Sequence, residues 1–430
     1  MDVVFFSLFR ADNPYSSISL SMAKELAKHH RVIYVNHPYS VRDMWRGLRD
    51  GDRDMVARLP RFFTGRVRYE HLAAIPNNFV SVIPPLLLPI NWLPPGRIYK
   101  FFHRINNALI LHTIRRALRD HQVNNFIYIN CFDMIYARVL PKKMGAQLSI
   151  YHCIDDITDD HYLGKHSIES ENEAIRKADL TFVTSTNLYK LKRPLSDRVV
   201  TYFNAADVEN FRQVRTQTYP RPKELDGRKG QVIGFVGNLD SYRIDYELLK
   251  KVALAYPDKT LLLVGPVNST EPKEIGLDKL PNVVFAGSRR LQDLPPLMQY
   301  MDCVLIPFRY NRVTQSIYPL KINEYLAAGK PVVSTSFSDD IRSFADCIYL
   351  AEKHEQFVER IADALAEQDP ALVQCRADVA DSNTWEARIA QLWDIVSSKL
   401  ERSKFERSKV HNLYAAEPTN LEPHTTDAKH

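Results

Sequence analysis

Residues 307–333 read PFRYNRVTQSIYPLKINEYLAAGKPVV. The apolar run Cys303–Ile306 before this stretch has the character of a buried strand, and so does Pro331–Thr335 at its end. Between them lie a polar loop and a helical pattern over Ile317–Ala328, which Gly329 ends. A strand, a crossover helix and a second strand in this order predict a parallel α/β sheet.

The start of this helix has the chemistry of a phosphate site. A helix that opens near Ser316 directs free backbone N–H groups and a positive dipole at one point. Lys321, on the second turn of the helix, would add a point charge to a diphosphate. Glu324, one turn further on, would accept hydrogen bonds from a ribose diol. The alternative is that Lys321 and Glu324 form a surface pair on an ordinary helix.

The same alternation of short apolar runs and helical stretches fills most of the 430 residues. It predicts two α/β domains, 1–205 and 231–383, because a domain typically takes roughly 100–200 residues. The segment 206–230 ends in a polar stretch rich in Arg, Lys, Pro and Gly and is interpreted as a linker. A terminal helix, 384–400, is expected to return to the first domain, and the polar tail 401–430 is expected to be disordered.

The individual elements follow from the same patterns. The expected strands are 3–6, 31–35, 79–83, 125–129, 148–152 and 180–184 in the first half, and 232–236, 260–264, 283–285, 303–306 and 331–335 in the second. The expected helices are 17–28, 99–119 and 169–177, then 246–255, 294–300, 317–328 and 355–367.

Two stretches of the second half resemble a known family. Pro319–Val333 has the order Pro-x-Lys-x-x-Glu-Tyr-x-Ala-x-Gly-x-Pro-Val-Val, and Ile233–Asp240 reads Ile-Gly-Phe-Val-Gly-Asn-Leu-Asp. Both are similar to the group 1 glycosyltransferases of the GT-B fold, in particular those of bacterial envelope polysaccharide synthesis. The resemblance implies an α/β protein of two Rossmann-like, doubly wound parallel-sheet domains facing a cleft. It also implies that the second domain binds a nucleotide-diphospho-sugar and the first binds the acceptor.

The resemblance assigns donor-binding residues position by position. It implies that the turn at Gly237 approaches the donor diphosphate, that Arg243 or Lys321 neutralises it, and that Glu324 holds the ribose. Further donor-binding candidates lie in the same two stretches: Asn238, Thr314, Gln315 and Ser316. The family commonly has a second Glu eight residues before the ribose-binding one. Ser316 stands at that position here, so this chain departs from the family's pattern.

In the first half, Tyr151-His152-Cys153-Ile154-Asp155-Asp156 resembles a Tyr-Asp-x-x-Asp-Asp stretch of some bacterial members. Asp155 and Asp156, at a strand end, are the catalytic candidates, since adjacent carboxylates serve as a general base when burial raises one pKa. They equally suit the cap of the following helix. Ser16 and Ser17 are acceptor-binding candidates, with capping of the next helix as the alternative.

Residues 71–119 contain no carboxylate. This stretch combines the apolar, Pro-rich run 84–95 with a row of bases: Arg97, Lys100, Arg104, Arg115, Arg116 and Arg119. Apolar and aromatic side chains beside bases predict contact with an anionic membrane surface through 84–119. The alternative is a core helix flanked by a Pro-rich loop, with solvated bases.

Composition excludes several other classes. The 14 glycines form neither G-x-G nor a P-loop, and the five cysteines contain no C-x-x-C. Asp50-Gly51-Asp52 follows no hydrophobic strand, so we interpret it as an exposed loop and expect no metal and no cofactor besides the donor substrate. The basic surplus lies in an apolar segment, which argues against nucleic-acid binding. Sparse cysteines and an acidic N-terminus favour the reducing cytosol.

These observations favour a glycosyltransferase that moves a sugar from a nucleotide-diphospho-sugar to a lipid-linked or saccharide acceptor at the cytoplasmic membrane face, in polysaccharide or cell-envelope biosynthesis. Two alternatives share the fold. A non-hydrolysing nucleotide-sugar epimerase would need no acceptor, and a non-catalytic nucleotide-sugar binder would bind the donor without turnover.

Overall fold

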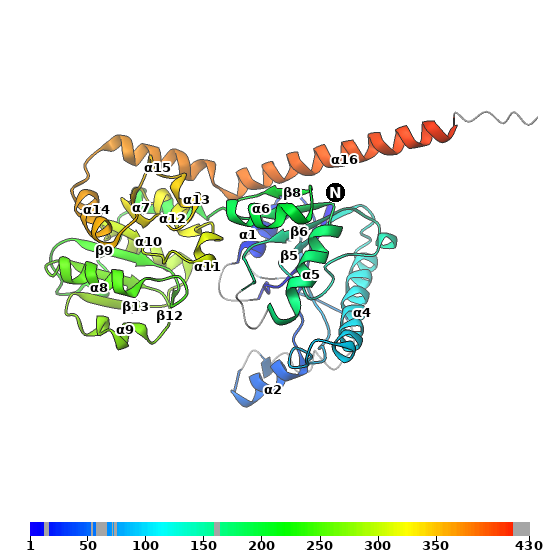
Figure 1. The fold of residues 1–430 in the computed structure, drawn as a ribbon, viewed down its shortest axis with the longest axis horizontal. Helices are drawn as coiled ribbons and strands as arrows, with labels where there is room; N and C mark the ends of the chain where they lie inside the picture. The colour runs from blue at the N-terminus through cyan, green and yellow to red at the C-terminus, as the bar shows by residue number, and fades with distance from the viewer. Residues whose placement is uncertain are drawn as a thin grey trace, which may run out of the picture. The chain divides into compact units, whose positions relative to one another are not determined.

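The computed structural model describes residues 1–12, 17–52, 55–56, 67–70, 72, 75–158 and 164–415, with the backbone alone given for 164–165 and 403–415. Two parallel β-sheets organise this part of the chain. The first sheet and its helices occupy the blue-to-green part of the ribbon, and the second sheet and its helices occupy the green-to-orange part (Figure 1).

The first sheet has eight strands in the order β3-β4-β2-β1-β5-β6-β7-β8. Its strands are β1 Asp2–Ser7, β2 Val32–Asn36, β3 Arg68–Glu70, β4 Phe79–Ile83, β5 Phe126–Cys131, β6 Ala146–Cys153, β7 Leu180–Val183 and β8 Val199–Thr201. All neighbours are parallel except β3, which pairs antiparallel with β4. The helices of this half are α1 Ile18–Ala27, α2 Val41–Arg49, α4 Arg97–Asp120, α5 Gly164–Lys177 and α6 Thr186–Lys192.

The second sheet has six parallel strands in the order β13-β11-β9-β14-β15-β16. They are β9 Val232–Val236, β11 Thr260–Val264, β13 Val283–Gly287, β14 Cys303–Ile306, β15 Val332–Thr335 and β16 Tyr349–Ala351, and a small parallel pair joins β10 Leu239–Asp240 to β12 Val267–Asn268. The helices are α7 Val208–Thr216, α8 Tyr246–Ala255, α9 Glu271–Glu274, α10 Leu294–Gln299, α11 Arg312–Gln315, α12 Leu320–Ala327, α13 Asp339–Arg342, α14 His354–Ala366 and α15 Pro370–Ser382.

Both sheets are doubly wound. Strands β2, β9, β11 and β14 are buried along their whole length, which is typical of parallel strands covered by helices on both faces. In each sheet the strand order reverses at its first strand, β1 or β9. Ligands of such sheets bind beyond the carboxyl ends of the strands at the reversal point. The predicted α/β class is therefore confirmed, and β9, β11, β14 and α8 have the predicted bounds.

The helix expected over 317–328 differs from the prediction. Residues 312–315 form a separate short helix, α11, whose Asn311 and Thr314 build a capping box, and Ser316 is the C-cap of α11. Helix α12 begins only at Leu320, after Pro319, because proline fits the start of a helix and not its interior. Lys321 therefore lies in the first turn of α12 and not in the second.

The segment 206–230 is not an open linker. Val208, Phe211 and Val214 lie one helical turn apart on α7, and all three are buried in the core of the second sheet. Helix α7 packs against α10 and α12. The polar stretch that begins at Gln213 predicts a linker, whereas the apolar residues Val208, Phe211 and Val214 pack this segment into the second domain.

The C-terminal helix α16 runs from Trp385 to Ala415, beyond the predicted end at residue 400. At its beginning, the Tyr202 hydroxyl donates to the Arg388 carbonyl over 2.9 Å. The prediction ended the helix at residue 400 because the chain becomes polar there. However, the Glu, Arg and Lys residues that follow Leu400 are good helix formers, so the helix continues. Residues 416–430 of the predicted tail lie outside the described residues.

Two of the five cysteines form a disulfide, which the sequence did not predict. It joins Cys347, just before β16, to Cys375 on α15, with a Cα–Cα distance of 5.9 Å. Cys131, Cys153 and Cys303 are free and buried. A pair 28 residues apart in sequence carries no spacing motif, so the sequence offered no signal for it.

Arg376 provides a test of the packing beside α15. It is fully buried, its Nη1 and Nη2 bind the two oxygens of Glu367 at 2.6 Å each, and its Nε donates to the Cys347 carbonyl. Arg376→Ala leaves Glu367 with a buried, uncompensated charge, so we expect a loss of about 3–5 kcal/mol in the free energy of unfolding in urea. Arg360→Ala removes an exposed pair with Asp363 and should change it by less than about 1 kcal/mol. Equal effects would contradict this account.

Candidate active site

Helix α12 is tied to the end of strand β9. The buried Tyr325 hydroxyl accepts a hydrogen bond from the Val236 N–H over 2.8 Å and donates one to the Val236 carbonyl over 3.2 Å. Val236 ends β9, and Gly237 follows it. The turn at Gly237 and the helix that carries Lys321 and Glu324 therefore adjoin.

The Gly237 turn is held by close backbone contacts. The Gly237 N–H donates to the Val264 carbonyl over 2.9 Å. Gly265 has φ +147°, and a Cβ at this position would lie 1.7 Å from the Gly237 carbonyl oxygen. Only glycine fits there without moving the turn. The exposed Asn238 side chain accepts a 2.8 Å hydrogen bond from Asn268.

Lys321 and Glu324 form an ion pair over 2.8 Å. The surface-pair alternative describes it poorly, because Glu324 is only 7% exposed. At the helix start, Pro319 provides no side-chain hydrogen bond, so the first-turn N–H groups of α12 have no capping side chain. A helix N-terminus, a lysine and a buried carboxylate thus share one small region, which suits a group that is anionic at one end and carries hydroxyls at the other.

Arg243 belongs to a loop that pairs with the loop after β14. Its guanidinium binds Asp240, with 2.7 Å between Nε and Oδ2, and its carbonyl accepts from the Arg309 N–H over 2.8 Å. An isolated bridge joins Ile244 to Phe308. Because β9 and β14 flank the reversal point of the second sheet, Arg243 lies where a ligand of this sheet is expected.

Two residues of the donor motif make side-chain hydrogen bonds inside the protein. The buried Thr314 hydroxyl donates to the Arg309 carbonyl and caps α11. The buried Ser316 donates to the Arg312 carbonyl and accepts from Asn187. Both hydroxyls are therefore used inside the protein in this arrangement, and a role of these two residues in donor binding stays a prediction. Gln315 is half-buried, and its role in donor binding stays a prediction.

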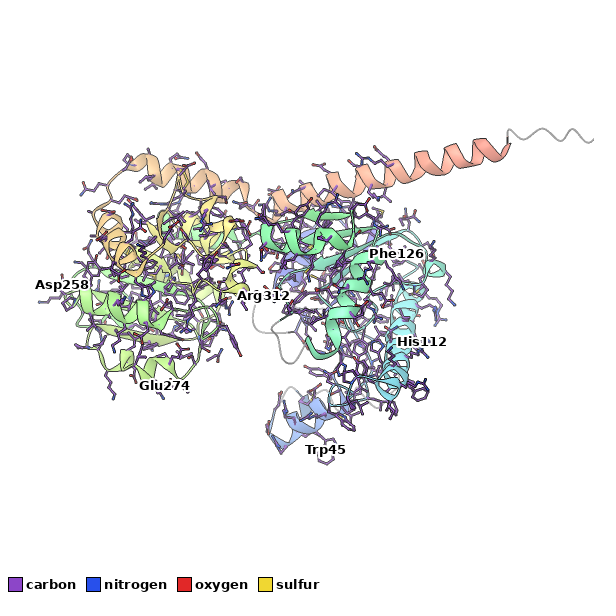
Figure 2. All side chains as sticks on the ribbon, in the orientation of Figure 1. Trp45, His112, Phe126, Asp258, Glu274 and Arg312 are labelled. Atoms are coloured by element: carbon purple, nitrogen blue, oxygen red, sulfur yellow. A yellow bond between two sulfur atoms is a disulfide. The ribbon has the colours of Figure 1, made fainter. Side chains whose placement is uncertain are left out.

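Asp155 and Asp156 follow the end of β6 and differ from each other. Burial opposes ionisation of the Asp156 carboxyl, but hydrogen bonds from Thr158 and Arg312 outweigh it and lower its pKa. The Arg312 Nε lies 3.1 Å from Asp156 Oδ2, so a residue of α11 (Figure 2) contacts the first domain's strand end. The Asp155 residue keeps an exposed surface, yet desolvation of its carboxyl raises its pKa against the opposing charge of Arg243.

The capping alternatives have separate outcomes. Helix α5 begins at Gly164, so neither Asp155 nor Asp156 is its N-cap. Ser17 is the N-cap of α1, and its hydroxyl accepts from the Leu20 N–H. This supports capping for Ser17, and its role in acceptor binding stays a prediction. Ser16 lies outside the described residues.

Several residues that make hydrogen bonds near the strand ends were not predicted from the sequence. Ser185 donates to the Ser316 carbonyl over 2.7 Å, and the Thr186 hydroxyl donates to the buried Asp340 over 2.5 Å. His37 and Asp133, which follow β2 and β5, are joined over 2.6 Å. The only available signal was that Ser185, His37 and Asp133 stand just after strands, since their partners are remote in sequence.

The described residues give no sign of a metal cluster or of a membrane-spanning helix. Within the described ranges, no group of three or more His, Cys, Asp or Glu side chains is placed to hold a metal ion. Asp50 and Asp52 are exposed, as expected. No helix of the described chain has both the length and the apolar character required to cross a bilayer.

The comparisons with known proteins agree with the motifs. Residues 230–367 match the model of the family described as Glycosyl transferases group 1. Over 232 residues the chain is 28% identical to TuaH of Bacillus subtilis (strain 168), which is named, provisionally, as a teichuronic acid biosynthesis glycosyltransferase. The match covers 52% of this chain and 58% of that protein, so the chain spans little more than half the length of this curated relative.

Solved structures establish the fold. Anabaena Alr3699/HepE, in complex with UDP, has a TM-score of 0.62 at 14% identity and covers 93% of this chain and 100% of its own. The UDP-forming α,α-trehalose-phosphate synthase of Burkholderia vietnamiensis has a TM-score of 0.66 at 10% identity, over 93% and 97%. The two doubly wound sheets are those of the GT-B fold. The predicted GT-B fold is confirmed, and residues 230–367 of this chain are similar to the group 1 glycosyltransferases, as their match to that family's model indicates.

Proposed function

We propose that this chain is a glycosyltransferase that moves a sugar from a nucleotide-diphospho-sugar to a lipid-linked or saccharide acceptor in polysaccharide or cell-envelope biosynthesis. The observation that carries the proposal is the double hydrogen bond between Tyr325 and Val236, which joins helix α12 to the strand end that precedes the Gly237 turn. The family match, the teichuronic acid relative and the UDP in the HepE complex support the same chemistry.

The donor binds in the second domain. The first-turn N–H groups of α12 and the Lys321 ammonium receive the diphosphate, and Glu324 accepts hydrogen bonds from the ribose hydroxyls. An ammonium has three donors, so Lys321 keeps Glu324 while it reaches a phosphate. When the bond from the anomeric carbon to the diphosphate breaks, its electron pair leaves with the diphosphate, and Lys321 and Arg243 stabilise that charge. The donor is a substrate, and the proposal includes no cofactor and no metal.

In this proposal, Asp155 and Asp156 have different roles on the acceptor side. Asp156 binds Arg312 and is held ionised, so it positions the α11 loop of the donor domain. Asp155 has the raised pKa and lies within reach of the Arg243 charge. A carboxylate with a raised pKa is the better proton acceptor of the two. Asp155 is therefore the proposed base for the acceptor hydroxyl.

The proposal places the acceptor at an anionic membrane surface on the cytoplasmic side. Large apolar side chains are exposed on one face of α4 and on the loop before it: Leu88, Trp92, Ile98, Phe101, Ile105 and Leu109. Asn106 binds both the N–H and the carbonyl of Leu88, so loop and helix form one surface. Leu87 pairs with Tyr39 and Val41, which adds α2 and its 68%-exposed Trp45 (Figure 2).

The opposite face of α4 has the other predicted character. Ile110, Ile114 and Ala117 are buried, so α4 is also a core helix. The exposed face nevertheless combines apolar side chains with Lys100 and Arg104 and lacks carboxylates, which suits anionic lipid headgroups. The buried face of α4 thus agrees with the core-helix alternative, and the proposal assigns the membrane contact to the exposed face.

Lys321→Ala tests the donor site. We expect turnover of a verified nucleotide-sugar donor to fall by orders of magnitude, because the variant loses a charge that stabilises the leaving diphosphate. The measurement is the rate of nucleoside diphosphate release. Lys279→Ala, an exposed lysine of the same domain, is the matched control and should keep the wild-type rate. Unchanged turnover in Lys321→Ala would refute the role of this residue.

Gly265→Ala tests the Gly237 turn independently of charge. The new methyl group clashes with the Gly237 carbonyl, so we expect UDP affinity, measured by calorimetry, to fall at least tenfold. Gly276→Ala is the matched control: Gly276 also has a positive φ, +72°, and a Cβ there meets nothing within 4 Å. The account fails if the two variants bind UDP with equal affinity.

Phe101→Ser and Trp92→Ser test the membrane face. Each removes exposed apolar surface, so we expect weaker cosedimentation with phosphatidylglycerol vesicles, and added salt should weaken the wild type further. Leu254→Ser changes an equally exposed apolar residue on α8 and should bind like the wild type. Wild-type binding that is equal on phosphatidylcholine and phosphatidylglycerol vesicles would rule out an anionic surface.

A further inference from the structure

Three strands of the first sheet end at one level. Ser7, the last residue of β1, is in register with Asn36 on one side and Cys131 on the other, and these end β2 and β5. The strand order reverses at β1, so this is the crevice where a ligand of the first sheet is expected. His37 follows β2 and Asp133 lies just beyond β5. The hydrogen bond between them crosses the end of β1.

Asp133 is fixed before it meets the histidine. Its side chain is fully buried, and its Oδ1 accepts from the N–H groups of Ile135 over 3.0 Å and Tyr136 over 2.8 Å. Asn130 binds both the N–H and the carbonyl of Asp133. The carboxylate therefore has one oxygen, Oδ2, left for His37. Such a network holds an acceptor in one place and one orientation.

This geometry sets the tautomer of His37. Its Nδ1 lies 2.6 Å from Asp133 Oδ2, and an ionised carboxylate can only accept, so Nδ1 carries the proton. In the neutral imidazole, Nε2 then presents a lone pair. No residue of the described chain bonds to Nε2, and the His37 side chain is 26% exposed, whereas a purely structural link would be covered at both ends.

The backbone of His37 is held from the other side. Arg10 Nη1 donates to the His37 carbonyl over 2.6 Å, while its guanidinium is paired with Asp12 and lies 3.7 Å from the ring centre of Tyr39. The Tyr136 ring adjoins the imidazole, with 6.1 Å between centroids. An imidazole fixed by ring, carboxylate and backbone is a preorganised hydrogen-bond acceptor.

We propose that His37 Nε2 accepts a hydrogen bond from a hydroxyl of the acceptor saccharide, and that Asp133 is the positioning residue that holds the imidazole for it. The inference rests on the proposed glycosyltransferase function and names the part of the first domain that the acceptor touches. Strands β2 and β6 are three spacings apart, about 14 Å. His37 and Asp155 therefore serve different hydroxyls of one acceptor, and His37 sets its orientation.

The test separates binding of the acceptor from binding of the donor. The assay measures glucose transfer from UDP-glucose to octyl β-D-glucopyranoside. In His37→Ala we expect the KM for the glucoside to rise at least tenfold, while kcat and the KM for UDP-glucose stay within twofold. His37→Gln should recover most of this loss, because the Gln amide oxygen accepts a hydrogen bond near the place of Nε2. Asp133→Asn should act like His37→Ala.

Controls distinguish the possible failures. His29→Ala removes an exposed histidine at the end of α1 and should leave both KM values unchanged. Variants that bind UDP normally in calorimetry but keep the wild-type KM for the glucoside would overturn the inference alone. A wild-type chain that binds none of the common nucleoside diphosphates (UDP, GDP, ADP or dTDP) would overturn the proposed function itself. Because Asp133→Asn disturbs a buried network, melting temperatures are compared, and the His37 pair decides the question if Asp133→Asn is unfolded.

A spectroscopic measurement adds a readout that a structural role would not move. In ¹⁵N-histidine NMR of the full chain, we expect a His37 Nε2 resonance of an unprotonated nitrogen that shifts when octyl β-D-glucopyranoside is added with UDP. A resonance that stays in place at a saturating glucoside concentration would overturn the inference.

Discussion

A single tyrosine hydroxyl, that of Tyr325, holds the donor half of the site together. It satisfies both backbone groups of Val236, and leaving one such buried group without a partner costs about 1–3 kcal/mol. Helix α12 therefore cannot slide along β9 without losing both hydrogen bonds. The Gly237 turn is fixed from its other side by Gly265, whose missing Cβ lets two backbones approach. The proposed diphosphate site lies where these two constraints meet.

Positive and negative side chains lie on different domains around the proposed donor site. Cationic side chains, Lys321 and Arg243, lie on the second domain, and carboxylates, Asp155 and Asp156, lie at a strand end of the first. Arg312 joins the two sides through Asp156. Cations beside the leaving diphosphate and a carboxylate beside the attacking hydroxyl are the distribution that group transfer requires, since negative charge moves from the nucleophile to the leaving group.

Much of this arrangement follows from local sequence. Buried parallel strands such as Val232–Val236 and Thr260–Val264 are short β-branched or leucine runs, and nothing competes with that pattern. Helix α12 was predicted three residues too long at its start, because Pro319 decides the start and the apolar pattern runs through it. Pairs such as His37 with Asp133, or Thr186 with Asp340, join segments distant in sequence, so no single stretch contains their signal.

The contact between the two sheets' domains bears on how the site works. Ser185, Thr186 and Asn187, at the start of α6, bind Ser316 and Asp340 through hydrogen bonds. Burial raises the pKa of Asp340, although the bonds from Thr186 favour its ionised form. A contact made of hydrogen bonds forms and breaks with less loss than one made of a large apolar area, because water can replace each partner. Ser316 ends the helix that carries Arg312, so the contacts of Ser316 with Ser185 and of Arg312 with Asp156 lie on one short element.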